Sequence, residues 1–123
     1  MPKVLVVDDD AVTRITVSAL FSRNGCEVVE AEDAAHARTQ LETHEVDLVV
    51  CDFEMPGLNG GEFRVELGAD YATPFVLLTG FGGASEIAGL PGVELVDAVL
   101  TKPIGSSSIS DLVERFLTES NAA

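Results

Sequence analysis

Short apolar runs alternate along the chain with stretches in which apolar residues recur every three or four positions. The runs are continuous rather than alternating, which is typical of strands buried on both faces of a parallel sheet. The run at 27–31 is more polar than the others and indicates an edge strand. The pattern predicts five strands, over residues 3–7, 27–31, 47–51, 74–78 and 95–101.

Helical periodicity fills the intervals between these runs. The last helix is the clearest, because its apolar residues fall at i, i+3, i+4 and i+7, and Ser106 to Ser108 are expected to cap its start. Asn24-Gly25 is expected to end the first helix, and Asp33 to cap the second. The predicted helices are 11–23, 34–43, a stretch after Asn59-Gly60 that buries Phe63 and Leu67, a weak stretch near 84–90, and a last one holding Ile109, Leu112, Val113 and Phe116.

Glycine and proline interrupt the fourth helical stretch. It follows the glycine-rich segment 80–83, and Gly89 and Pro91-Gly92 break it early. A glycine inside a helix costs about 0.5–1 kcal/mol relative to alanine. We therefore predict that residues 82–94 form a short or mobile segment.

Five buried strands alternating with helices predict an α/β fold, a doubly wound parallel sheet with helices on both faces. The 123 residues suffice for one domain, 1–123, and we expect neither a linker nor an output domain. In such sheets ligands bind outside the carboxyl ends of the strands.

Acidic residues outnumber basic ones 21 to 7, and the net charge is −14. Such a chain is repelled by nucleic acid and by anionic membranes, and it attracts divalent cations. No apolar run is long enough to span a membrane and no signal pattern opens the chain, so a cytoplasmic location is expected.

Cys26 and Cys51 lack metal-motif spacing and are predicted to be buried free thiols, whereas His36 and His44 are expected at the surface.

Polar residues close four of the five predicted strands. Asp8-Asp9 end the first, Asp52 the third, Thr79 the fourth and Lys102 the fifth. In a parallel sheet these residues crowd one edge, where three carboxylates would raise one another's pKa by about 1–3 units. A hard cation such as Mg²⁺, which prefers oxygen ligands, removes that conflict.

This arrangement predicts a phosphoryl-accepting site, in which Asp52 attacks a phosphoryl group in line. Mg²⁺ and Lys102 would offset the charge on the transferring oxygens, and the hydroxyl of Thr79 would donate to one of them. The acyl phosphate adds a charge of about −1.5 to −2, and Thr79 and Lys102 would move to meet it. Taken alone, each residue has a common structural explanation; Asp10, for example, is a candidate cap of the first helix.

Four motifs carry a resemblance to the response-regulator receiver domains of two-component signalling, and it covers essentially the whole chain. They are Val6-Val7-Asp8-Asp9, Asp52-x-x-Met55-Pro56-x-x-x-Gly60, Leu78-Thr79-Gly80 and Thr101-Lys102-Pro103. The resemblance implies a sheet of order 2-1-3-4-5. It also implies that Asp52 accepts a phosphoryl group from a histidine kinase or a histidine phosphotransfer protein. Such a phosphoprotein assists its own phosphotransfer and dephosphorylation, is not an enzyme that turns over an external substrate, and signals to a downstream protein target.

The resemblance also implies a metal site. Asp9, Asp52 and the backbone carbonyl of Glu54 would hold Mg²⁺ or Mn²⁺, and Asp8 would act through a water. The threonine and the lysine keep the phosphoryl contacts inferred above. The side chain of Glu54 could lie beside the phosphoryl group, where a carboxylate would either repel or position the hydrolytic water.

The chain departs from the usual receiver pattern at three places. Val99 stands three residues before the lysine, where many receivers carry a Tyr or Phe whose ring swings as the threonine moves. Gly80 opens a Thr-Gly-Phe-Gly stretch like that of a minority of stand-alone receivers, and Pro91 interrupts the fourth helical segment. We therefore expect phosphorylation to order residues 82–94 rather than to flip a ring.

Two alternatives stay open. Asp8-x-Asp10 after an apolar strand, with Thr79 and Lys102, also resembles haloacid-dehalogenase-type phosphohydrolases, in which the first aspartate is the nucleophile. Those enzymes need a further acidic pair after the lysine and a cap domain. Here the candidates for the pair are Asp111, Glu114 and Glu119, in or next to the amphipathic final helix. The other alternative is a receiver fold that serves only as a binding module.

Overall fold

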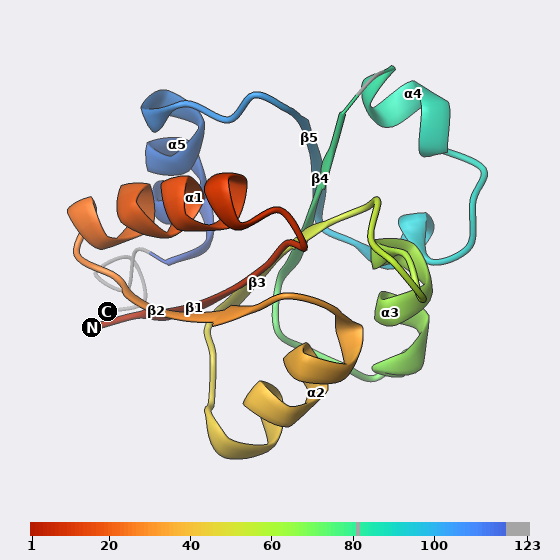
Figure 1. Cartoon of the computed structure of the whole chain (residues 1–123), viewed down its shortest axis with the longest axis horizontal. Helices are drawn as coiled ribbons and strands as arrows, with labels where there is room; N and C mark the ends of the chain where they lie inside the picture. Colours follow the sequence, from red (N-terminus) through yellow and green to blue (C-terminus); the bar gives the residue numbers. More distant parts are fainter. Residues whose placement is uncertain (81, 118–123) are drawn as a thin grey trace.

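Five parallel strands form one sheet in the order β2-β1-β3-β4-β5, with helices on both faces (Figure 1). This computed structural model describes residues 1–80 and 82–117, so Phe81 and Glu119 lie outside it. The strands are β1 Lys3–Val7, β2 Glu27–Ala31, β3 Leu48–Asp52, β4 Phe75–Thr79 and β5 Ala98–Thr101. The helices are α1 Ala11–Arg23, α2 Ala34–Thr43, α3 Gly60–Glu66, α4 Gly83–Ile87 and α5 Ser106–Phe116, with a 3-10 turn, η1, at Val93–Leu95. The predicted fold class and strand order are confirmed.

The strand bounds differ from the prediction in an informative way. β3 and β4 each lie one residue later than predicted, so Asp52 and Thr79 are the last paired residues of their strands rather than the first residues after them. The predicted start of β5 at residue 95 is wrong. Leu95 instead ends η1, which is closed by a hydrogen bond from Leu95 N to the carbonyl of Gly92, and Val96 is its C-cap.

Side-chain caps begin three of the helices. Asp10 caps α1 and Asp33 caps α2, as predicted, and Asn59 caps α3. The predicted serine cap of α5 is wrong, because Ser106 to Ser108 already lie within its first turn. The capping position is held by Gly105, which has no side chain to accept a backbone N–H.

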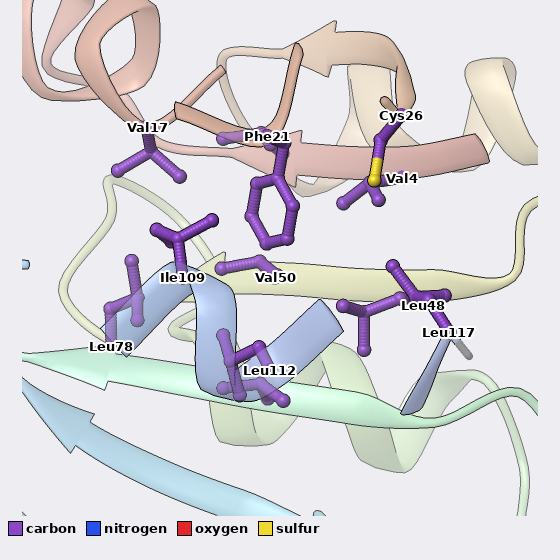
Figure 2. Packing of buried hydrophobic residues seen from close by; sticks show 12 residues of the cluster. Val4, Val17, Phe21, Cys26, Leu48, Val50, Leu78, Ile109, Leu112 and Leu117 are labelled. Carbon is purple, nitrogen blue, oxygen red and sulfur yellow. The ribbon is translucent and has the colours of Figure 1, made fainter. Parts of the chain in front are cut away.

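Two apolar clusters, one on each face, fix the strands in place. Val4 and Val6 of β1 face the cluster under α1 and α5, whose packing Figure 2 shows, and Leu5 and Val7 face the cluster under α2 and α3. Residues of the first cluster include Val17, Phe21, Cys26, Leu48, Val50, Leu78, Ile109, Leu112 and Leu117.

The burial of the cysteines and of Phe63 agrees with the prediction, and that of the two histidines agrees in part. Both cysteines are free and buried, as predicted. Phe63 of α3 is fully buried and Leu67 partly so. His36 is exposed as predicted, whereas His44 is half-buried, with Nδ1 3.4 Å from Nζ of Lys3.

The segment between β4 and β5 is short-helical, as predicted. α4 has five residues. Gly82 is its N-cap and Gly83 its first residue, and both adopt left-handed backbone conformations, with φ of 88° and 64°. A Cβ on Gly83 would lie 2.6 Å from Oγ1 of Thr101, and the positive φ strains any residue with a side chain, so both features favour glycine here. The mobility of residues 82–94 stays a prediction. Within the described ranges, no helix has both the length and the apolar character needed to cross a lipid bilayer.

Candidate functional site

The four strand ends named by the sequence meet at one edge of the sheet. Asp8 follows β1, Asp52 and Thr79 end β3 and β4, and Lys102 follows β5. The carboxylates of Asp8 and Asp52 are almost completely removed from solvent, with only 1% and 3% of each residue exposed. Burying two like charges side by side is costly unless a cation accompanies them.

Asp8, Asp9 and Asp52 form an acidic cluster in which one ligand atom from each lies within 4.8 Å of the others. Asp9 is exposed, so the cluster is open to solvent on that side. Carboxylate oxygens at this spacing are the donor set that Mg²⁺ prefers, and Mn²⁺ accepts the same ligands. The donors present therefore fit the predicted divalent cation.

Lys102 bridges the two buried carboxylates. Its Nζ lies 2.9 Å from Oδ1 of Asp52 and 3.2 Å from Oδ2 of Asp8. One ammonium thus balances part of a cluster that carries three negative charges when all its members are ionised. The remaining excess of negative charge is a second reason to expect a cation here.

The pKa of Asp52 is raised to about 6, chiefly because burial disfavours the charged carboxylate. The hydrogen bond with Lys102 opposes the shift, while the charges of Asp8 and Glu54 add to it. Burial acts to lower the pKa of Lys102, but the hydrogen bond and charge of Asp52, together with Asp8, outweigh it and raise that pKa. At neutral pH the site therefore holds an ionised aspartate beside a charged lysine.

Thr79 is fully buried, and its Oγ1 has no hydrogen-bond partner among residues 1–80 and 82–117. An unpartnered buried hydroxyl costs about 1–3 kcal/mol, so native structures usually satisfy such groups or use them. A hydroxyl held free at the end of β4 is available to a group that enters from outside, as predicted for a phosphoryl oxygen.

The family model of the response regulator receiver domain matches residues 4–114. The chain belongs to this family. The chain is 30% identical over 118 residues to the aerobic respiration control protein ArcA of Escherichia coli K12, and the match covers 95% of this chain and 49% of ArcA. The receiver spans about half the length of the curated relatives it matches.

Solved receiver structures agree with the fold. A receiver domain protein from Clostridium thermocellum superimposes with a TM-score of 0.84 at 25% identity, covering 99% of this chain and 98% of that one. The response regulator TrrA from Thermotoga maritima, in complex with Mg²⁺-BeF, gives a TM-score of 0.83 at 27% identity, covering 95% of this chain and all of that one, 100%. Phosphorylation on an aspartate and Mg²⁺ binding in the acidic pocket are general to receivers.

Asp10 separates the receiver from the phosphohydrolase alternative. Its Oδ2 accepts hydrogen bonds from N and Oγ1 of Thr13, at 3.1 and 2.5 Å, which lower the pKa of Asp10. A general acid works best with a raised pKa, whereas the pKa of Asp10 is lowered and one of its carboxylate oxygens is engaged by Thr13. In this receiver it is a helix cap.

Glu54 lies at the mouth of the site. Its side chain is exposed and reaches over Gly80, since a Cβ on Gly80 would be 3.8 Å from Oε1 of Glu54. Its charge contributes to the raised pKa of Asp52, so the carboxylate acts on the site electrostatically. The metal-binding role of its backbone carbonyl stays a prediction.

Two residues of the site were given no role by the sequence pattern, although one of them, Gly60, is part of a receiver motif. Gly60 begins α3 directly behind Asp52, where a Cβ would lie 2.6 Å from the Asp52 carbonyl oxygen. Arg14 of α1 donates from Nη1 to the Asp8 carbonyl oxygen at 2.8 Å. Its position one helical turn after the acidic run was the available clue, because α1 begins directly after that run.

Proposed function

We propose that this receiver accepts a phosphoryl group on Asp52 from a histidine kinase or a histidine phosphotransfer protein, in a Mg²⁺-dependent reaction. The phosphorylated chain then signals by binding a downstream protein, in the cytoplasm. The observation that carries the proposal is Lys102 held between the buried carboxylates of Asp8 and Asp52. The acceptor assists its own phosphorylation and dephosphorylation and turns over no external substrate.

The proposed reaction uses the Asp52 carboxylate as a nucleophile. It attacks the phosphorus in line, the N–P bond of the donor phosphohistidine breaks, and the departing imidazole takes a proton from solvent. Asp9, Asp52 and the Glu54 carbonyl would hold Mg²⁺, with Asp8 acting through a water, and the ion would supply positive charge to offset that of the phosphoryl group.

Lys102 and Thr79 complete the phosphoryl site. The ammonium of Lys102, now paired with Asp52 and Asp8, would pair with a phosphoryl oxygen as the acyl phosphate forms. Thr79 can donate its hydroxyl proton without breaking an existing hydrogen bond to any described residue, because its Oγ1 has none. Both contacts stabilise the product and draw the two side chains toward Asp52.

The experiment that tests the proposal locates the phosphoryl group. The protein is incubated with acetyl phosphate and Mg²⁺, quenched in acid, and mapped by peptide mass spectrometry after borohydride reduction of the acyl phosphate. We expect modification at Asp52 that disappears when EDTA replaces Mg²⁺. Modification at Asp8 would support the phosphohydrolase instead, and no modification would support a binding module.

The partner that delivers the phosphoryl group is proposed to dock on α1. Val12 and Ile15 are 73% and 58% exposed, which is unusual for large apolar side chains of a helix. Val12 also lines a groove of about 340 Å³, together with Thr16, Lys102 and Ile104, among others. An exposed apolar face that borders the phosphoryl site suits a partner that must bring a histidine to Asp52.

Replacing Ile15 with glutamate is therefore expected to slow phosphotransfer from the cognate kinase or phosphotransfer protein by roughly tenfold. Losing a buried isoleucine contact costs about 1.5–3 kcal/mol, and 1.4 kcal/mol corresponds to a factor of ten. Phosphorylation by acetyl phosphate should be unchanged, since the small donor needs no docking face. Val65→Glu, at an exposed position on α3, is the matched control. Equal loss in both variants would contradict docking on α1.

A further inference from the structure

Arg14 joins three elements around the acidic cluster. Its Nε donates to Oε1 of Glu30 on β2 at 3.0 Å, and its Nη1 donates to the carbonyl oxygen of Asp8 at 2.8 Å. The side chain is largely buried, and it leaves from the first turns of α1. A planar guanidinium can make both bonds at once, which the single ammonium of a lysine cannot do in this geometry.

The polar atoms of Asp8 are held from several directions. Its backbone N donates to the carbonyl of Ala31 at 3.1 Å, and its Oδ1 accepts from the backbone N of Asp10 at 2.9 Å. Its Oδ2 pairs with Lys102, and its carbonyl oxygen accepts from Arg14. The position of this carboxylate is thus determined by bonds to β2, α1 and the residue after β5.

Asp8 needs such support because the sheet does not hold it against β3. The β1–β3 pairing ends at Val7 and Cys51, one residue before Asp8. Beyond that point the negative charges of Asp9 and Asp52, whose ligand atoms lie within 4.8 Å of that of Asp8, repel the Asp8 carboxylate, which is itself almost completely buried. The bonds from Ala31 and Arg14 resist the displacement that this repulsion favours.

We propose that Arg14 is a positioning residue, which holds the Asp8 main chain against β2 and thereby sets the spacing of the acidic cluster for a divalent cation. It touches no reacting atom; it acts through Asp8. Groups one shell beyond metal ligands typically change metal affinity by 10–100-fold when they are replaced. The part of the inference that concerns Mg²⁺ rests on the proposed function, whereas the part that concerns the position of Asp8 does not.

The test replaces Arg14 with glutamine, which keeps a donor but loses the charge and the second bond. We expect Arg14→Gln to weaken Mg²⁺ binding, measured by titration calorimetry, by roughly tenfold. Arg14→Lys should recover part of the loss, because it keeps the charge and one donor. Arg38→Gln is the matched control, since Arg38 pairs with Glu66 between α2 and α3, on the exposed surface. It should bind Mg²⁺ as the wild type does.

A second readout needs no metal. The backbone N–H of Asp10, which bonds to Oδ1 of Asp8, reports the position of that carboxylate through its amide resonance. We expect this resonance to shift in metal-free Arg14→Gln and not in Arg38→Gln. A general loss of folding would instead move resonances throughout the sheet, so this signature separates positioning from fold stability. If Arg14→Gln does not fold, Arg14→Lys is judged by the same two measurements.

An unchanged Asp10 resonance together with Mg²⁺ affinity within twofold of the wild type, in a folded Arg14 variant, would overturn the inference. A wild-type protein that binds no Mg²⁺ would instead refute the proposed function. The Asp10 resonance of the metal-free variants would then decide alone, a shift supporting the positioning role and no shift overturning it.

Discussion

The Asp52→Asn variant is expected to lose phosphoryl acceptance completely and, without metal, to be more stable than the wild type at neutral pH. The loss follows because an amide cannot form the acyl phosphate. The gain follows because burial opposes the charge on Asp52 and raises its pKa from the usual 3.8 to about 6. The two effects have opposite signs, so an inactive variant cannot be explained by unfolding.

The pH dependence follows from the direction of this shift. The folded protein holds the Asp52 proton more tightly than the unfolded chain does, so the wild type gains stability from Asp52 as pH falls through about 6 toward 3.8. That contribution is fully lost above pH 6. Since asparagine is neutral throughout, the gain of Asp52→Asn should be about 1–3 kcal/mol at pH 8 and should vanish near pH 4.

Urea denaturation in EDTA at pH 8 and near pH 4 measures this difference, and intact mass after treatment with acetyl phosphate and Mg²⁺ measures phosphoryl acceptance. Asp70→Asn, at an exposed position, should change neither quantity. If Asp52→Asn is less stable than the wild type at pH 8, the ion pair of Asp52 with Lys102 outweighs burial. Phosphoryl acceptance by the variant would refute Asp52 as the acceptor.

Gly60→Ala is expected to destabilise the protein by about 2–3 kcal/mol, although alanine normally favours a helix. The added Cβ would lie 2.6 Å from the carbonyl oxygen of Asp52 and 2.6 Å from Cδ2 of Leu77, and 3.1 Å from Cα of Phe53. Two of these neighbours are main-chain atoms of β3 and the residue after it, so relief would require α3 or the end of β3 to move. Such a movement would also displace the Asp52 carboxylate.

Denaturant unfolding measures the loss of stability, and the rate of phosphorylation by acetyl phosphate reports the displacement of Asp52. Gly89→Ala is the control, because Gly89 has no atoms within 4 Å of a Cβ and no positive φ. It should be neutral or slightly stabilising, by up to about 1 kcal/mol. A loss below about 1 kcal/mol in Gly60→Ala would mean that α3 moves aside without resistance.

The sequence predicts the framework well because burial on both faces leaves a continuous apolar run for each inner strand. Four strands and the first two helices follow from that pattern almost residue by residue, and the strand order from the receiver motifs. β5 is the exception. Leu95 and Val96 are as apolar as strand residues, but hydrogen bonds after Gly92 close a 3-10 turn there, and residue type alone does not distinguish the two.

The site was predictable as a set of strand ends but not as a set of contacts. Lys102 reaches both Asp8 and Asp52 because the strand order brings the carboxyl ends of β1, β3 and β5 close together. No local sequence pattern contains that arrangement. Gly60 shows the same limit. The motif contains a glycine here, but only the structure shows why: a Cβ would lie too close to the Asp52 carbonyl oxygen of β3. Val99 stands where many receivers carry an aromatic residue. It is half-buried and packs against the cluster under α2 and α3.

The pairing of Thr79 constrains how fast, and by what motion, this receiver can respond. Thr79 is paired with Thr101 of β5, its carbonyl accepts from Lys102 N at 2.8 Å, and the preceding Leu78 pairs with Asp52 of β3. Translating the Thr79 main chain would break pairs on both sides, whereas rotation about its χ1 breaks none. This rotation is a local change, unlike the collective motions of loops and domains, which take microseconds to milliseconds. The Thr79 side chain would therefore change its rotamer while the sheet keeps its geometry. Any delay between phosphorylation and response would arise in the segments outside the sheet.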